Sequence, residues 1–172
     1  MRAGRRIVLV GLLAVLAFSI SYWFTSRSPD LSRRLGTPTP PVTKPSVVVY
    51  VPHFVDSRTE WQAKPVPVGE GEDPLRTALE HLMITRDSPF PSGTRVLRVR
   101  VVDHVAEVDF SRDLIDNFHG GSTTEAWIVE SLCRTMAQFS DVEKVRILVE
   151  GKRIETIGEH IDVSEPVPVR PL

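Results

Sequence analysis

The segment from Asn117 to Trp127, NFHGGSTTEAW, gathers the side chains of this chain that are best suited to chemistry. Its adjacent glycines could form a nest of backbone N–H groups for an anion. Asp116, His119 and Ser122 lie close together in the sequence and have the residue types of a hydrolytic triad. The segment also has the composition of a helix start, so a reactive loop and a helix cap are the two interpretations to compare.

The motifs that would support a reactive loop are missing. A phosphate loop of the Walker type requires G-x-x-x-x-G-K-[ST] and a dinucleotide site requires G-x-G-x-x-G, and the sequence contains neither. The HGG sequence resembles the oxyanion loop of some hydrolases, but that fold also needs a G-x-S-x-G nucleophile elbow, which is absent. We therefore predict that the protein is not an enzyme and has no catalytic residues. A hydrolase that uses Asp116 and His119 is the weaker alternative.

Metal and cofactor sites are not indicated either. The histidines show no H-E-x-x-H motif and no other spacing typical of metal ligands. The acidic residues near the C-terminus lack the spacing of a calcium loop. We therefore predict no metal and no cofactor. The histidines are His53, His81, His104, His119 and His160.

The helix-cap interpretation rests on Ser122 and Glu125, which have the spacing of a capping box. Ser122 would accept a hydrogen bond from the backbone N–H of Glu125, and Glu125 would reach back to the N–H of Ser122. An apolar stripe then predicts a helix over residues 123–139, with Cys133 as a small buried side chain. Partner or ligand contacts remain open for the residues beside this cap, namely Asn117, Phe118, His119 and Trp127.

The first part of the folded region predicts strand, then helix. Residues 46–53 are β-branched and apolar on both faces, which is typical of a central strand. The two prolines in residues 64–68 allow at most an edge strand. Asp73 and Pro74 are typical of an N-cap and a first helical residue, and apolar side chains at helical spacing follow them up to the loop at 86–93.

The second part predicts a hairpin over residues 94–111, with Asp103-His104 in its turn. Leu97, Val99 and Val101 should face the core, and the arginines between them should pair with acids of the returning strand on the exposed face. A strand is expected at 145–150, followed by a tight turn at Gly151-Lys152 and a short returning strand. The order β-α-β-β-α-β predicts an α+β fold, a small mixed sheet with two helices on one face.

The N-terminal region predicts a membrane segment. Residues 7–24 are uncharged and apolar, and at about 1.5 Å per residue they nearly match a hydrocarbon core of about 30 Å. Arginines at positions 2, 5 and 6 predict a cytoplasmic N-terminus and an extracytoplasmic C-terminal domain, as in a single-pass membrane protein. An uncleaved anchor and a cleaved signal peptide both remain open, because Ser19 and Ser21 are weak cleavage-site residues.

A tether and an acidic domain follow the membrane segment. Residues 25–45 are rich in proline, serine and threonine and contain too few large apolar residues to form a core. Residues 1–34 carry a net charge of +5, whereas residues 35–172 carry −6. A domain of that charge is unsuited to nucleic acid, which is bound mainly through basic side chains.

Several segments together resemble the GerMN domain, the sporulation and spore germination family. The resemblance covers about Ser46 to Glu165 and differs from the family pattern only at two turns, Asp103-His104 and Ser140-Asp141. The segments are VVVYVP, DPLRTALEHLM, PSGTRVLRVRVVDHVAEVDFS, GGSTTEAWIVESLCRTMAQF and VRILVEGKRIETIGEHIDVSEP. We therefore expect a GerMN-like domain at residues 46–166 and a C-terminal tail at 167–172.

The resemblance implies an extracytoplasmic domain whose fold is similar to ring-building motifs. Known members act in cell-envelope or spore-envelope complexes and are not established enzymes. We accordingly expect a non-enzymatic, membrane-anchored module of cell-envelope protein assembly, with other envelope proteins or a second copy as partners and a possible role in sporulation or germination. The alternative is a module that binds peptidoglycan or another glycan fragment.

Overall fold

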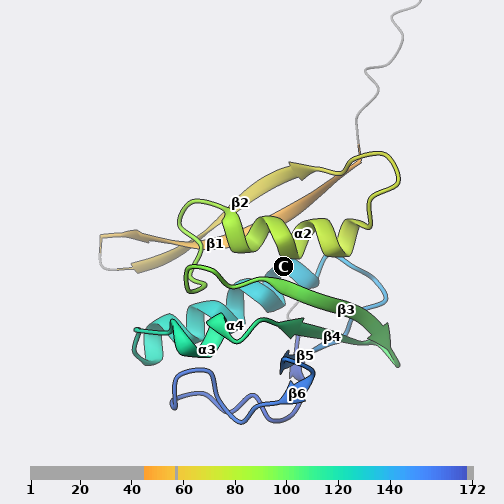
Figure 1. The fold of residues 1–172 in the computed structure, drawn as a ribbon. Coiled ribbons are helices and arrows are strands. Elements are labelled where there is room, and N and C mark those ends of the chain that lie inside the picture. Colours follow the sequence, from red (N-terminus) through yellow and green to blue (C-terminus); the bar gives the residue numbers. More distant parts are fainter. Residues whose placement is uncertain (1–44, 57, 170–172) are drawn as a thin grey trace, which may run out of the picture. The chain divides into compact units, whose positions relative to one another are not determined.

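The hairpin of β1 (Ser46–Val55) and β2 (Arg58–Pro67) is the first element in the computed structural model, which describes residues 45–56 and 58–169. The two strands form their own antiparallel sheet (Figure 1). Along β1 the side chains of Val47, Val49 and Val51 are buried, whereas those between them are partly exposed. The prediction of a central strand for residues 46–53 is therefore wrong, since β1 buries one face and, among the strands that the structure describes, pairs only with β2.

The prolines of β2 fit because of the strand register. Pro65 lies opposite Val48 and Pro67 lies opposite Ser46. A proline has no N–H to give to its partner, so these pairs are of the kind that exchanges no backbone hydrogen bonds. Val48 instead directs its backbone away from β2, where its N–H donates to Gln138 Oε1 at 2.9 Å and its C=O accepts from Gln138 Nε2 at 2.8 Å. The side chain of Gln138 thus closes the second edge of β1.

Helix α2 (Pro74–Ile84) agrees with the prediction made from its sequence. The Asp73 side chain accepts from the Leu75 N–H at 3.0 Å, and Pro74 occupies the first helical position. The helix ends before the loop at residues 86–93, and its apolar face is buried. The cap and the apolar spacing therefore locate this helix correctly.

The second hairpin, β3 (Val96–Val102) and β4 (Val105–Phe110), is also confirmed. Asp103 and His104 both have positive φ, 50° and 61°, as a two-residue type I′ turn requires. Arg100 pairs with Glu107 at 2.6 Å across the strands. Leu97, which was predicted to face the core, is instead 44% exposed because a register shift at this point of β3 turns it outward.

The chain continues through α3 (Asp113–Asp116) and α4 (Ser122–Met136) to β5 (Lys144–Val149), which pairs in parallel with β4. The tight turn uses Glu150 and Gly151, one position earlier than predicted, and leads into β6 (Lys152–Arg153). Finally β7 (Val167–Pro168) pairs with β5, so residues expected to form a tail belong to the domain.

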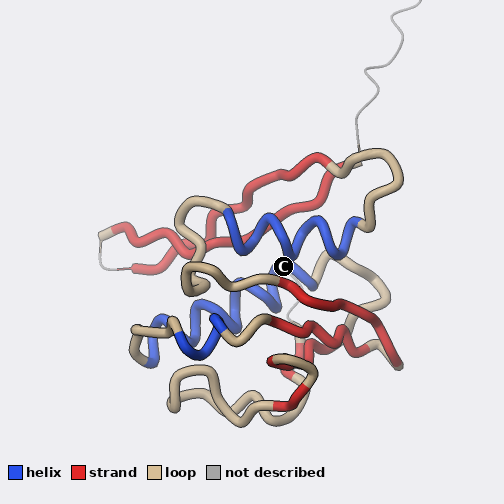
Figure 2. Tube along the Cα trace, in the orientation of Figure 1, coloured by secondary structure: helices blue, strands red, loops and turns tan. Residues whose placement is uncertain are grey.

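The core lies between these layers. Helices α2 and α4 contact each other and β1, and they also pack on β3 and β5 of the five-stranded sheet. The helices lie together beside that sheet (Figure 2). The predicted α+β class is confirmed, but the strands form two sheets and not the single small sheet that was predicted, because β1 pairs with β2 in a sheet of its own. The large, fully buried side chains include Phe110, Leu79, Leu132 and Ile147.

The described part of the chain contains no helix long and apolar enough to span a membrane. The predicted anchor at residues 7–24 and nearly all of the predicted tether at 25–45 lie outside the described residues.

Candidate functional site

The loop that precedes α4 begins at Asn117, which is held on two sides. Its backbone N–H donates to the carbonyl of Asp113 at 3.1 Å, which closes α3. Its side-chain Nδ2 donates to the carbonyl of Ser92 at 2.9 Å and to Asp113 Oδ1 at 3.3 Å. Asn117, predicted as a possible partner contact, therefore joins the loop at residues 92–93 to α3.

Ser111, the last residue of the segment VDFS at residues 108–111, extends this network of hydrogen bonds. Its hydroxyl donates to Asp113 Oδ2 at 2.8 Å and accepts the Arg95 N–H at 3.0 Å. Asp109 of the same segment is buried, and its Oδ1 accepts the Gly151 N–H at 2.7 Å. The polar residues of this segment thus fix turns and strand ends.

Phe118 is half-buried and packs against the core from the same loop. Its ring lies directly against Gly158, where an added Cβ would overlap the ring. Gly120 is similarly close to Thr124, whose Cβ lies 2.5 Å from the position of an added Cβ. The loop therefore touches the C-terminal segment closely and leaves no room for larger side chains at these glycines.

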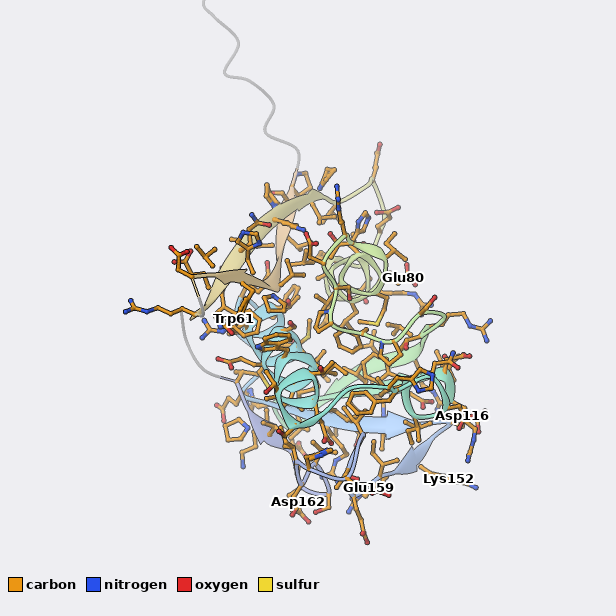
Figure 3. All side chains as sticks on the ribbon, turned by 90° about the vertical axis from the view of Figure 1, so that its left-hand side faces the viewer. Trp61, Glu80, Asp116, Lys152, Glu159 and Asp162 are labelled. Atoms are coloured by element: carbon orange, nitrogen blue, oxygen red, sulfur yellow. The ribbon has the colours of Figure 1, made fainter. Side chains whose placement is uncertain are left out.

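The imagined triad is not assembled. Asp116 forms an ion pair with Arg112 at 3.3 Å on the exposed face of α3 (Figure 3). His119 and Ser122 are exposed, and within residues 45–56 and 58–169 no hydrogen bond joins either of them to Asp116. Asp116, His119 and Ser122 therefore form no hydrogen-bonded set in the described part of the chain.

The predicted cap by Ser122 and Glu125 is wrong. Gly121 is the N-cap residue of α4, and no side chain caps this end of the helix. The Glu125 N–H donates to the Gly121 carbonyl at 3.1 Å, as in the first turn of an ordinary helix. Ser122 is exposed, because the chain enters the helix one residue earlier than the capping box would require.

Glu125 instead points inward and holds the C-terminal loop. Its side chain is fully buried. Oε1 accepts the backbone N–H groups of Ile157 and Gly158, each at 2.9 Å. Oε2 accepts the N–H of His160 at 2.9 Å and lies 3.2 Å from His160 Nδ1. One carboxylate thus holds three backbone N–H groups within the four-residue segment 157–160.

These contacts decide the charge state of Glu125. Burial raises the pKa of a carboxyl group, because it removes water from the ionised form. The backbone N–H groups of Gly158, Ile157 and His160, together with that of Ile161, favour the ionised form and outweigh burial, so the pKa of Glu125 lies below its usual value. The group is a charged structural anchor at neutral pH.

The sequence carried a signal for this anchor. Glu125 lies three and seven positions before Ile128 and Leu132, and all three are fully buried on α4. A carboxylate on the apolar face of a helix needs hydrogen-bond donors from another segment, because a buried charge without partners is very unfavourable. The capping-box spacing suggested a different role for Glu125, although its place on the apolar face of the helix was more informative.

Trp127, the last predicted contact residue, is half-buried on α4. A different tryptophan forms the clearest aromatic contact of this helix. The guanidinium of Arg134 lies 4.7 Å from the ring centroid of Trp61, which comes from β2 (Figure 3). Glu130 orients Arg134 through hydrogen bonds at 2.8 and 3.1 Å. The hairpin is thereby attached to the outer side of α4.

An apolar pocket of about 160 Å³ lies between α4 and the C-terminal segment. Ala126, Val129 and Cys133 line it from the helix, and Ile161 and Val167 line it from the C-terminal segment. Glu130 and Arg134 also border it. Sequence periodicity did not reveal this pocket, because Ile161 lies outside any helix or strand and Val167 belongs to a strand of only two residues, too short to give a recognisable pattern.

No group of three or more histidine, cysteine, aspartate or glutamate side chains is suited to a metal ion within the described residues. The site as a whole is a junction of three loops, at residues 92–93, 117–121 and 156–161, around the start of α4. Its polar groups are largely occupied by contacts within the domain, and its open surface is the apolar pocket beside the helix.

Comparison with known proteins gives a consistent result. The family model "Germane: Sporulation and spore germination" matches residues 47–155. No curated protein sequence matches the chain. Among solved structures, the first GerMN domain of the sporulation protein GerM from Bacillus subtilis is 22% identical with a TM-score of 0.52, covering 74% of this chain and 95% of that one.

Two further structures share the fold. The tandem GerMN domains of the same protein are 21% identical with a TM-score of 0.52, and the match covers 73% of this chain and 45% of the tandem. A protein from Clostridium perfringens, described as a candidate lipoprotein, is 19% identical with a TM-score of 0.52, covering 72% of this chain and 87% of that one. At these identities the likeness concerns the fold.

Proposed function

This chain belongs to the Germane family of sporulation and spore germination domains, and from that premise we propose that it is a non-enzymatic module of cell-envelope protein assembly. The observation that carries the proposal is the use of Glu125. The most strongly held polar group of the candidate site, a fully buried carboxylate, uses its oxygens to hold the backbone of residues 157–160. The site therefore keeps the surface formed by residues 157–160 in one conformation.

The geometry of the candidate reactive residues supports a non-enzymatic role. Asp116 pairs with Arg112, Asn117 bonds Ser92 and Asp113, and Phe118 packs on Gly158. General acid–base or nucleophilic catalysis requires a nucleophile and a base within hydrogen-bond reach of each other. Asp116, His119 and Ser122 do not meet that condition.

The proposed location is the outer side of the cell membrane. The sequence of residues 7–24 supports a single membrane-spanning segment, with arginines before it that favour a cytoplasmic N-terminus. The likeness to a candidate lipoprotein and to a sporulation protein fits an envelope location. A reporter fused after Leu172 should be active only outside the cytoplasm, and activity inside would contradict the proposed orientation.

Photo-crosslinking in intact cells tests the assembly function. A photoreactive amino acid at His119, which is exposed and makes no contact that fixes the fold, should give covalent adducts with defined envelope proteins. The matched control is the same substitution at Ile84, an exposed residue at the end of α2. If neither position gives adducts and the whole protein is retained on purified peptidoglycan, the result contradicts the assembly function and supports glycan binding.

A further inference from the structure

The outer half of the β1–β2 hairpin is exposed on both faces. Val47, Val49 and Val51 bury the inner half of β1 against the helices, but His53 and Phe54 are exposed, as are residues 58–60 of β2. The hairpin reaches beyond the helices as an arm (Figure 1). Because a two-stranded hairpin alone is only marginally stable in water, such an arm is stabilised when it lies on a second surface.

Phe54 lies near the end of this arm and is 65% exposed. Four large apolar side chains are exposed within the described residues, and Phe54 is the aromatic one; the others are Ile84, Leu97 and Val102. An aromatic ring carries a large apolar surface with few rotatable bonds, which makes it an effective anchor in protein interfaces. The arm thus presents a single anchor side chain.

The pocket beside α4 has the size and chemistry to receive such a ring. Its volume is about 160 Å³, and an apolar cavity of about 150 Å³ accommodates a benzene molecule. Ala126 and Val129 face Ile161 and Val167 across it. The segment that carries Ile161 follows directly on residues 157–160, which Glu125 holds, so the pocket is formed before any ligand arrives.

We propose that Phe54 of one copy of this protein inserts into the α4 pocket of a second copy. The arm and the pocket are made by different elements, so each copy offers one of each, and the contact is heterologous. Repetition of such a contact gives a closed ring or an open chain of copies. The proposal rests on the assembly function for its biological purpose and supplies a specific partner for it.

A membrane surface is a less suitable occupant for the arm. The charged residues nearest the tip are Asp56, Arg58 and Glu60, two acids and one base. Segments that lie on anionic membranes are rich in lysine and arginine, because these side chains are attracted to the lipid headgroups. The arm has the opposite balance, whereas an apolar protein pocket does not require positive charge.

A complementation experiment with two variants of the full chain tests the contact. Phe54→Asp removes the inserted ring but keeps the pocket, and Ala126→Phe fills the pocket but keeps Phe54. In detergent, by sedimentation at up to about 1 mM protein, the wild type should form species larger than a dimer, since single-anchor interfaces are weak. Each variant alone should stay monomeric, and an equimolar mixture should form a one-to-one dimer and nothing larger.

Two further variants serve as controls for this experiment. Ile84→Asp changes an exposed apolar residue outside the contact and should associate like the wild type. Val167→Phe fills the pocket from its other wall and should behave like Ala126→Phe, provided that circular dichroism shows both to be folded. A wild type that stays monomeric, a Phe54→Asp protein that still associates, or a folded variant pair that does not combine would each overturn the proposal.

Two further outcomes separate this contact from its alternatives. Binding of the wild type to vesicles of anionic phospholipid that is lost in Phe54→Asp would show that the arm inserts into a membrane, and would overturn self-association. If the wild type is monomeric yet still gives adducts with envelope proteins at position 119, the self-contact fails while the assembly function stands. Association without any such adducts supports the self-contact and contradicts the broader assembly function.

Discussion

His160 approaches the Glu125 carboxylate twice, with its backbone N–H 2.9 Å and its ring Nδ1 3.2 Å from Oε2. The carboxylate is fully buried, whereas the histidine side chain is 43% exposed. Glu125 therefore anchors the C-terminal loop from inside the domain, and His160 covers the anchor from the solvent side. The stability of this loop should depend on the charge of a single glutamate.

Replacing Glu125 with Gln should destabilise the domain by about 2–3 kcal/mol. The oxygen of the new amide can still accept hydrogen bonds from Ile157 and Gly158, but its NH₂ group would face the N–H of His160, so that hydrogen bond is lost. Hydrogen bonds to a charged group are worth about 1.5–3 kcal/mol. Urea denaturation measures the loss. The matched control is Glu130→Gln, whose partly exposed pair with Arg134 should contribute only about 0.5 kcal/mol.

Stability should fall in acid because of the same residue. The pKa of Glu125 is lowered in the folded protein, by backbone hydrogen bonds that outweigh burial. Its contribution is therefore complete above the unfolded pKa, about 4.3, and is lost as the pH falls through the lower folded pKa. Unfolding free energies between about pH 6 and pH 3 should decline less steeply for Glu125→Gln than for the wild type; equal slopes would contradict this assignment.

Replacing Gly158 with Ala should cost about 1–3 kcal/mol, because the added methyl group would overlap the ring of Phe118. Gly121→Ala is the control, since an added Cβ there meets no atom within 4 Å and its φ of −104° suits any residue. Thermal unfolding compares the two. A Phe118→Leu substitution made together with Gly158→Ala should recover part of the stability that Gly158→Ala loses. If the effects of the two substitutions are fully additive, residues 118 and 158 do not touch.

Replacing Gln138 with Ala should open the second edge of β1. The side-chain amide makes two hydrogen bonds to Val48, and each is worth about 0.5–1.5 kcal/mol. We expect a loss of about 1–3 kcal/mol and faster hydrogen exchange at the amide of Val48. Gln62→Ala, an exposed glutamine of β2, should change neither quantity.

Replacing Ser122 with Ala should have almost no effect, within about 0.5 kcal/mol. A serine that caps a helix contributes about 1 kcal/mol, but Ser122 makes no capping bond in this protein. Chemical denaturation distinguishes the two cases directly. A loss near 1 kcal/mol would restore the capping interpretation of this residue.

Much of the local structure could be predicted from the sequence, because local chemistry decides it. Asp73 and Pro74 specify a helix start whatever surrounds them, and Asp103-His104 between alternating strands specifies a tight turn. The cross-strand pair of Arg100 and Glu107 follows from that turn.

The two largest errors concern contacts between distant segments. β1 looks like a central strand because its exposed side chains are also apolar, yet Gln138 occupies the edge where another strand would pair. Glu125 looks like a capping residue because its spacing from Ser122 fits, whereas its true partners lie more than thirty positions further along the chain. The helical spacing places Glu125 on the buried face, but it does not identify partners so far along the chain.

The Gln138 contact with β1 also sets an order of folding events. Val48 and Gln138 are 90 positions apart in the sequence. The backbone N–H of Tyr50 donates to Thr135 Oγ1, which is 85 positions away. β1 therefore leaves the ribosome long before the residues that complete its second edge, and contacts of such sequence separation slow folding. Until α4 has been synthesised, one edge of the β1–β2 hairpin stays open to other chains, so a chaperone that shields extended segments should bind the nascent protein there.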